Sequence, residues 1–231
     1  KFGYWRDTHI RIEGSSVYML QMVFLIDWYY TTQKESFDEQ YFPKLSDMGN
    51  SMIQVVATGP DSDWEAIHYA YFSAICNAKE RVYIETPYFI PDESLLRALK
   101  SAALSGVDVR IVTPFIEDKW YAHIVTRAYY AQLIEAGVKI YEYTPGFIHS
   151  KTFVCDDEIG VVGTINMDYR SLYLHFECGV FLYKTKSVMQ IKEDFLNILE
   201  VSQNITLEDT KKVKWSNRFL RAILRVFAPL M

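Results

Sequence analysis

The chain of 231 residues is half hydrophobic and carries a formal net charge of −5. So large an apolar share can form a sizeable core and excludes a disordered chain. The acidic balance argues against a nucleic-acid binder, so we expect no nucleic-acid partner. The sequence has no uninterrupted apolar stretch of the roughly 18–20 residues that a membrane helix needs.

The predicted elements alternate between short strands and longer helices. The first 50 residues read as a strand at 8–12, an apolar helix from residue 17 and a polar linker at 31–50. The remaining strands are predicted at 53–56, 81–85, 107–112, 138–143, 147–155, 159–162 and 178–183, and the helices at 62–78, 92–105, 117–136 and 186–201. Alternation of this kind is typical of βαβ crossovers, so we expect an α/β fold with a mixed, mostly parallel central sheet flanked by helices.

The predicted strand 147–155 holds the residues that indicate chemistry. His149 and Lys151 lie two positions apart, so their side chains share one face of that strand. An imidazole and an ammonium among apolar neighbours are costly to place together unless a site uses them. Thr164 and Asn166 follow after a glycine turn, and such donors suit the non-bridging oxygens of a phosphate. We therefore expect Lys151, Thr164 and Asn166 to bind a substrate phosphate.

The spacing of these residues matches a known signature. His149, Lys151 and Asp156 form His-x-Lys-x4-Asp, and Gly163 with Asn166 forms Gly-x-x-Asn. Together they resemble the signature of the phospholipase D superfamily. Four further segments, at 4–9, 59–64, 86–92 and 167–171, are similar to bacterial cardiolipin synthases, so the resemblance covers essentially the whole chain.

The resemblance implies a role for each motif residue. Enzymes of this superfamily take one histidine from each of two such motifs and pass through a phosphohistidine. His149 matches the second motif, which implies a general acid and base, with the nucleophile as the alternative. Glu177 is implied as the carboxylate that orients the His149 ring. Asp156 belongs to the catalytic motif, although its opposite parity on the strand suits holding a turn.

A weak internal repeat concerns the start of the chain. Residues 6–12 align with residues 176–182, and an apolar helix follows each segment. Asp7 then aligns with Glu177 and would orient the histidine of a first motif that this sequence lacks. We expect residues 1–50 to be the end of an N-terminal phospholipase-D-like half plus a linker, and residues 51–231 to be the C-terminal catalytic half. The missing half, or a second copy of the chain, would complete the active site.

The resemblance also implies a reaction and a location. The reaction is a phosphatidyl transfer that makes cardiolipin and glycerol from two phosphatidylglycerol molecules, with no metal and no other cofactor. Two alternatives stay open: a phospholipase D-type phosphodiesterase or nuclease, and a non-catalytic fragment that binds phosphate. The full-length protein would lie on the cytoplasmic face of the bacterial cell membrane, anchored by upstream helices.

The last 19 residues have a composition of their own. Residues 213–231 read as an amphipathic helix with Arg218, Arg221 and Arg225 opposite an apolar side, and no acid follows Lys211. Such a helix can lie on an anionic membrane surface. The alternative is that its apolar side packs on the catalytic domain and the arginines are solvated.

Overall fold

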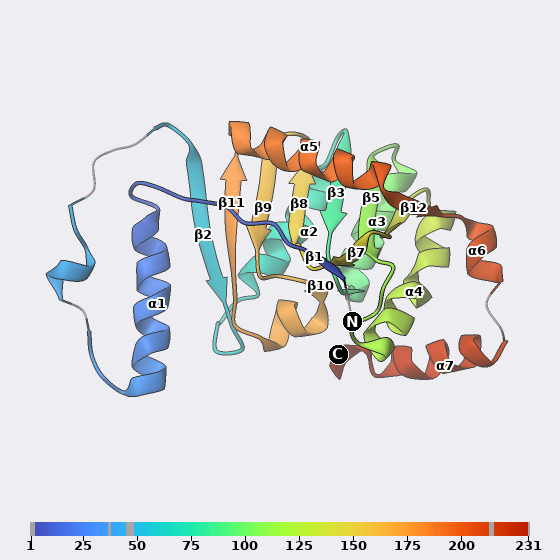
Figure 1. Cartoon of the computed structure of the whole chain (residues 1–231), viewed down its shortest axis with the longest axis horizontal. Coiled ribbons are helices and arrows are strands. Elements are labelled where there is room, and N and C mark those ends of the chain that lie inside the picture. The colour runs from blue at the N-terminus through green and yellow to red at the C-terminus, as the bar shows by residue number, and fades with distance from the viewer. Residues whose placement is uncertain (1–2, 37, 45–48, 213–214, 231) are drawn as a thin grey trace.

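The computed structural model describes residues 3–36, 38–44, 49–212 and 215–230, apart from the side chains of residues 215–219. A sheet of eight strands forms its centre, in the order β12-β6-β5-β3-β8-β9-β11-β2, and helices cover both faces (Figure 1). The helices are α1 (Val17–Thr32), α2 (Ala66–Asn77), α3 (Glu93–Leu104), α4 (Trp120–Glu135), α5 (Lys186–Glu200), α6 (Leu207–Lys211) and α7 (Trp215–Val226). The shorter helical turns are η1 (Glu39–Tyr41), η2 (Arg170–Leu174) and η3 (Ala228–Leu230).

Twelve strands form within the described residues. They are β1 (Tyr4–Arg6), β2 (Met52–Thr58), β3 (Arg81–Glu85), β4 (Phe89–Ile90), β5 (Asp108–Pro114), β6 (Lys139–Tyr143), β7 (Gly146–Ile148), β8 (Thr152–Cys155), β9 (Ile159–Gly163), β10 (Met167–Asp168), β11 (Glu177–Tyr183) and β12 (Ser202–Ile205). Two small parallel sheets, β1-β7 and β4-β10, stand beside the large one.

The direction of the strands corrects one expectation. The mixed α/β architecture is confirmed, but only β3, β5 and β6 run parallel to one another in the large sheet. The other pairings in that sheet are antiparallel, and one of them, between β8 and β9, is formed across a tight turn. The large sheet is therefore mixed and not mostly parallel.

Two hydrophobic clusters hold the helices on opposite faces of the sheet. One cluster joins α2, α3 and α4 to the sheet through side chains such as Ile67, Leu99 and Val125, which are fully buried. The other cluster places α5 on the opposite face through Val188 and Phe195. Burial of each such side chain stabilises the fold by about 1.5–3 kcal/mol, so the large sheet is a firm platform for the residues at its strand ends.

Local signals in the sequence set several helix ends. Asp92 caps α3, since its carboxylate accepts hydrogen bonds from the backbone N–H groups of Ser94 and Leu95. Gly106 follows α3 and Gly137 follows α4, and both have a positive φ. The expected start at Ser62 is wrong: α2 is preceded by Glu65 and has no side-chain cap.

The start of the chain also differs from expectation. Residues 8–12 form no strand, and the strand near the N-terminus is β1. It pairs with β7, so that Arg6 stands opposite Ile148. The backbone N–H of His149 then donates a 2.7 Å hydrogen bond to the Arg6 carbonyl. This pairing brings the first residues of the chain to the motif histidine.

Helix α1 stands at the edge of the molecule, beyond β2 (Figure 1). It is apolar around its whole circumference, yet Leu25 is its only buried residue. Phe24 and Tyr30 are 56% and 64% exposed. A helix that is apolar all round is normally buried, so α1 presents a surface suited to a further packing partner.

The C-terminal segment docks on the domain through a mixed face. Helix α7 packs against α4, where the Arg225 guanidinium lies 4.8 Å from the centre of the Tyr129 ring. Leu224 packs on the core beside it. Val226 and Phe227 remain 75% and 49% exposed, and Arg225 is exposed as well, so apolar residues and an arginine share the outer side. The expected division into a packed apolar side and a solvated basic side is therefore incomplete, because apolar side chains stand exposed beside Arg225.

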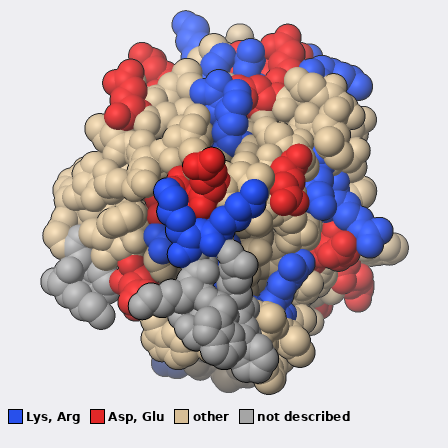
Figure 2. Space-filling model, turned by 90° about the vertical axis from the view of Figure 1, so that its right-hand side faces the viewer, with Lys and Arg blue, Asp and Glu red and all other residues tan. Residues whose placement is uncertain are grey.

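Charges of both signs cover this side of the molecule. Figure 2 shows the face over α4, α6 and α7, where Lys and Arg side chains lie next to Asp and Glu side chains. Within the described residues, no helix has the combination of length and hydropathy needed to cross a bilayer.

Candidate active site

His149 lies at a break between two strands. The expected continuous strand 147–155 is interrupted, because β7 ends at Ile148 and β8 begins at Thr152. The two motif side chains nevertheless meet, since Lys151 Nζ lies 3.0 Å from His149 Nε2. Lys151 also donates a hydrogen bond to the His149 carbonyl. The short irregular segment thus places the imidazole and the ammonium side by side at the start of β8, in the middle of the large sheet.

Asp7 fixes the tautomer of the histidine. Its Oδ2 atom lies 3.0 Å from His149 Nδ1. A carboxylate only accepts, so Nδ1 carries the proton and Nε2 keeps a lone pair. The Lys151 ammonium can donate to that lone pair. Lys151 Nζ also lies 3.1 Å from Nδ1, but the proton there is already donated to Asp7.

This contact changes the roles expected for the two acids. Asp7 was expected to serve a histidine outside this sequence, and it binds His149 instead. Glu177 was expected to orient His149, and it instead accepts hydrogen bonds from Ser171 Oγ, at 2.6 Å, and from Thr164 Oγ1. No hydrogen bond joins Glu177 to His149 in the part of the chain that the structure describes.

The electrostatics of the site follow from partial burial. Desolvation lowers the pKa of Lys151 to about 8, although nearby carboxylates, Asp7 foremost, oppose the shift. Burial also disfavours ionisation of Asp7, but the hydrogen bond with His149 outweighs it with help from the Thr8 N–H and the Lys151 charge. The pKa of Asp7 is therefore lowered. Asp7 stays ionised at neutral pH and can stabilise a protonated His149.

The two other expected phosphate ligands differ in what they can offer. Asn166 Nδ2 donates a 3.1 Å hydrogen bond to Ser171 Oγ, and an amide nitrogen has a second N–H to give. The Thr164 hydroxyl proton is donated to Glu177, while Thr164 Oγ1 accepts from the Cys178 N–H. Asn166 thus keeps a donor for a phosphate oxygen, whereas Thr164 acts within the Glu177 network.

Asp156 lies at the far end of β8 from His149. Its carboxylate accepts hydrogen bonds of 2.7–2.9 Å from the backbone N–H groups of Lys79, Glu80 and Arg81. These bonds tie the turn after β8 to the start of β3. Grouping Asp156 with the catalytic residues is thus corrected by the structure, which gives this carboxylate the turn-holding role that its parity favoured.

Three acidic or polar residues near Lys151 were missed by the sequence analysis. Glu85 is 1% exposed at the end of β3 and accepts a 2.9 Å hydrogen bond from Thr152. Desolvation raises the pKa of Glu85 to about 7 and that of Asp168 to about 6. Ser171 links Asn166 to Glu177. Asp168 and Ser171 lie in the family-like segment 167–171, and Glu85 ends a predicted strand, but neither signal assigned a role to these residues.

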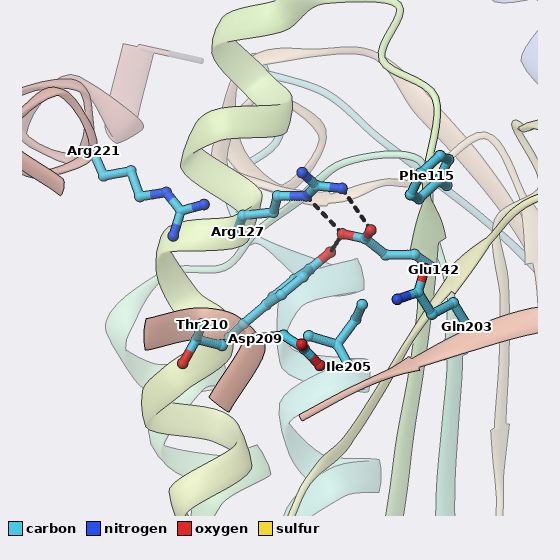
Figure 3. Close-up of a pocket in the computed structure, with 9 residues that line it drawn as sticks. Phe115, Arg127, Glu142, Gln203, Ile205, Asp209, Thr210 and Arg221 are labelled. Atoms are coloured by element: carbon cyan, nitrogen blue, oxygen red, sulfur yellow. Dashed lines mark hydrogen bonds and ion pairs between the residues drawn. The ribbon is translucent and has the colours of Figure 1, made fainter. Parts of the chain in front are cut away.

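A second pocket is lined by an ion pair between Arg127 and Glu142. Arg127 points toward Glu142 (Figure 3) and donates two hydrogen bonds to it, of 2.7 and 2.6 Å. The Tyr130 hydroxyl donates to the same carboxylate at 3.1 Å. Glu142 is 2% exposed, so both charges are satisfied within the protein. None of the residues around His149 lines this pocket.

Comparison with known proteins identifies the family. The family model described as "Cardiolipin synthase, PLD-like domain" matches residues 71–199, which is more than half of the chain. The chain belongs to this family. It is 45% identical over its whole length to the cardiolipin synthase of Halalkalibacterium halodurans, and 42% identical to cardiolipin synthase 2 of Staphylococcus epidermidis. These matches cover 46% and 48% of the relatives, so the chain spans about half the length of the curated relatives that it matches.

Solved structures agree on the fold. A phospholipase D family member, Nuc from Salmonella typhimurium, matches with a TM-score of 0.57 at 20% identity, over 68% of this chain and 99% of that protein. Phosphatidylserine synthase from Haemophilus influenzae matches with a TM-score of 0.58 at 15% identity, over 77% of this chain and 45% of that protein.

Proposed function

We propose that this chain is the second-motif half of a phosphatidyltransferase that converts two phosphatidylglycerol molecules into cardiolipin and glycerol. The observation that carries the proposal is the placement of His149, whose Nδ1–H is held by Asp7, so that Nε2, beside Lys151, is the ring atom left to exchange a proton with the substrate. Curated relatives named cardiolipin synthase supply the substrate class.

The first chemical step forms a covalent intermediate. The histidine of the first motif, on the other half, attacks phosphorus, and the bond from phosphorus to the glycerol oxygen breaks. This step uses the imidazolium form of His149, which carries a proton on Nε2 as well as on Nδ1, and Nε2 gives its proton to the departing oxygen. Lys151 and Asn166 neutralise the phosphate oxygens, and Asp7 stabilises the imidazolium before the proton leaves.

The second step resolves the intermediate. Neutral His149 Nε2 removes a proton from the terminal hydroxyl of a second phosphatidylglycerol, whose oxygen attacks phosphorus. The phosphorus–nitrogen bond breaks, and its electron pair returns to the first histidine. Throughout both steps the Nδ1 proton remains hydrogen-bonded to Asp7, so His149 transfers protons at one atom alone.

The missing half would cover the exposed apolar surface of α1. Phe24, Ile26 and Trp28 on that helix are 56%, 44% and 43% exposed, which is unusual for side chains of this size. The relatives are about twice as long as this chain, so a partner half of similar size would supply the covering surface. A second copy of the chain is the alternative partner.

Membrane contact is part of the same proposal. The substrates are lipids, and relatives of this name act in phospholipid synthesis, so the full-length protein would work on the cytoplasmic face of the bacterial membrane. The outward-facing apolar residues Ile223, Val226 and Phe227 offer a surface that could enter the lipid headgroup region.

The test compares the chain alone with the chain joined to an N-terminal half that carries the first motif. Both are incubated with phosphatidylglycerol, and cardiolipin is measured by mass spectrometry. We expect cardiolipin only from the two-motif protein. Full specific activity from the chain as a monomer would overturn the proposal, whereas activity that rises with chain concentration would identify a second copy as the partner.

A further inference from the structure

The proposed reaction needs two phosphate sites, and the cluster around His149 supplies one. Lys151 and Asn166 bind the phosphate that becomes attached to histidine. The acceptor lipid carries a second phosphodiester, one glycerol away from the attacking hydroxyl. An anionic acceptor in a site that already holds a phosphate requires further cations nearby.

A pocket next to the cluster offers such cations. Its volume is about 380 Å³, and Asn166, one of the proposed phosphate ligands, forms part of its wall. Lys119 and Arg170 contribute their charged side chains to the lining. They come from two separate elements, since Lys119 precedes α4 and Arg170 begins η2.

The carboxylates near these cations are engaged elsewhere. Asp118 accepts hydrogen bonds from the Tyr88 hydroxyl and from the Lys119 backbone N–H, at 2.6 Å for the latter. Asp168 is 4% exposed and accepts a 2.8 Å hydrogen bond from the Ser171 N–H. Asp168 also lines the pocket, and although burial raises its pKa to about 6, this carboxylate is still mostly ionised at pH 7. The charges of Lys119 and Arg170 together exceed that of this one buried carboxylate, so the lining keeps a net positive charge for a ligand.

Both cations are held in place. The Lys119 ammonium lies 5.0 Å from the centre of the Tyr88 ring. Arg170 Nε donates a 3.1 Å hydrogen bond to His175 Nε2, which fixes the plane of the guanidinium and leaves its two terminal nitrogens for a planar pair of hydrogen bonds to oxygen.

The same pocket also has exposed apolar residues in its lining. Phe227, which follows α7, and Leu230, from η3, line the pocket and are 49% and 71% exposed. A cavity lined by both cations and exposed apolar side chains suits a phosphodiester that carries acyl chains. A free inorganic ion would need only the cations.

We propose that this pocket is the acceptor-lipid subsite, in which Arg170 and Lys119 bind the phosphodiester of the second phosphatidylglycerol. The inference rests on the proposed phosphatidyl transfer and adds the residues that select its acceptor. Arg170 and Lys119 would make the enzyme prefer an acceptor that carries a phosphate over an acceptor that carries none.

The experiment uses the two-motif protein with phosphatidylglycerol as donor and three competing acceptors. They are phosphatidylglycerol itself, the deacylated phosphodiester glycerophosphoglycerol, and labelled glycerol, which has no phosphate. The variants are Arg170→Gln and Lys119→Gln, with Arg97→Gln as the control. Arg97 is exposed on α3, pairs with Glu93 and does not line the pocket.

The quantity measured is the kcat/KM for each phosphate-bearing acceptor divided by the kcat/KM for glycerol. We expect this ratio to fall by about 10- to 100-fold in each pocket variant, the usual range for one charge-assisted hydrogen bond, and to stay unchanged in Arg97→Gln. An unchanged ratio in both pocket variants, or a fall for phosphatidylglycerol without a fall for glycerophosphoglycerol, overturns the phosphate subsite.

The failure of the underlying reaction gives a different result. If the unsubstituted two-motif protein incorporates no labelled glycerol and makes no cardiolipin, phosphatidyl transfer itself is wrong. Should Arg170→Gln fail to fold, Lys119→Gln still decides the question, because the Lys119 side chain is exposed and its ammonium lies over the Tyr88 ring, so its replacement should leave the fold intact.

Discussion

Asp7 and His149 stand 142 positions apart in the sequence, and the Asp7 carboxylate lies 3.0 Å from His149 Nδ1. The parallel pairing of β1 with β7 creates this contact, since Asp7 follows one strand and His149 follows the other. The first residues of the chain are therefore part of the second motif's active site.

Replacing Asp7 tests this relationship. Asp7→Asn removes the negative charge that stabilises the His149 imidazolium, so we expect kcat of the two-motif protein to fall about 100-fold or more with little change in KM. Steady-state cardiolipin formation measures the effect. Asp63→Asn, the same change at an exposed position, is the control, and an Asp7→Asn enzyme within about twofold of the unsubstituted one contradicts the role.

The pH dependence of anion binding tests Lys151. A lysine with a pKa of about 8 is cationic below that pH and neutral above it. We expect the affinity for sulfate, whose own charge is constant here, to fall about tenfold for each pH unit above 8. Calorimetric titration between pH 6 and pH 10 measures this fall. Lys151→Arg keeps its charge, so its profile should stay flat, and a flat profile for the unsubstituted chain argues against Lys151 as the anion ligand.

Glu85 gives a prediction about stability. Its folded pKa, about 7, lies above its ordinary value of 4.5, so the folded state binds the proton more tightly than the unfolded state. Stability from this group is present below pH 4.5 and is lost as the pH rises to 7. Glu85→Gln keeps an acceptor for Thr152 without the buried charge. We expect it to raise the free energy of unfolding at pH 8 by up to about 3 kcal/mol, and by much less at pH 4.5.

Urea denaturation at both pH values measures that difference. Glu158→Gln, an exposed carboxyl on a turn, is the matched control. Equal effects of Glu85→Gln at the two pH values would show that the Glu85 proton plays no part in stability.

The motif predicted that His149 and Lys151 lie together, and their side chains meet because they stand two positions apart in one short segment; the joint role of these two residues and Asn166 stays a prediction. The partner of His149 could not be found in this way. The repeat aligned Asp7 with Glu177, but alignment carries no information about which strand β1 pairs with. That pairing is decided by contacts between residues about 140 positions apart. The directions of most strands could not be predicted for a related reason, since distant segments decide which strands pair. The short turn at Asp156 indicated only the antiparallel pair of β8 and β9.

Asp156 yields a test that separates structure from chemistry. Its three hydrogen bonds to backbone N–H groups hold β3 and β8 together. We expect Asp156→Ala to lower the free energy of unfolding by about 2 kcal/mol. Glu158→Ala on the same turn should change it little. A large fall in kcat without loss of stability would return Asp156 to the catalytic group.

The outward-facing apolar residues near the C-terminus give a binding prediction. Ile223 and Val226 are 41% and 75% exposed on α7. We expect Ile223→Ser with Val226→Ser to weaken binding to phosphatidylglycerol vesicles several-fold, while the melting temperature stays the same. Vesicle flotation measures binding. Equal binding by the double variant and the unsubstituted chain would remove this surface from membrane contact.

The role of His149 in phosphatidyl transfer is tested most directly by His149→Ala in the two-motif protein. Cardiolipin formed from phosphatidylglycerol is quantified by mass spectrometry, and circular dichroism checks that the fold is kept. Loss of the positioned acid and base should reduce the rate by at least about 10²–10⁴-fold. A folded His149→Ala variant that keeps about a tenth of the original rate would contradict the account, because the reaction would then proceed without the imidazole to which both proton transfers are assigned.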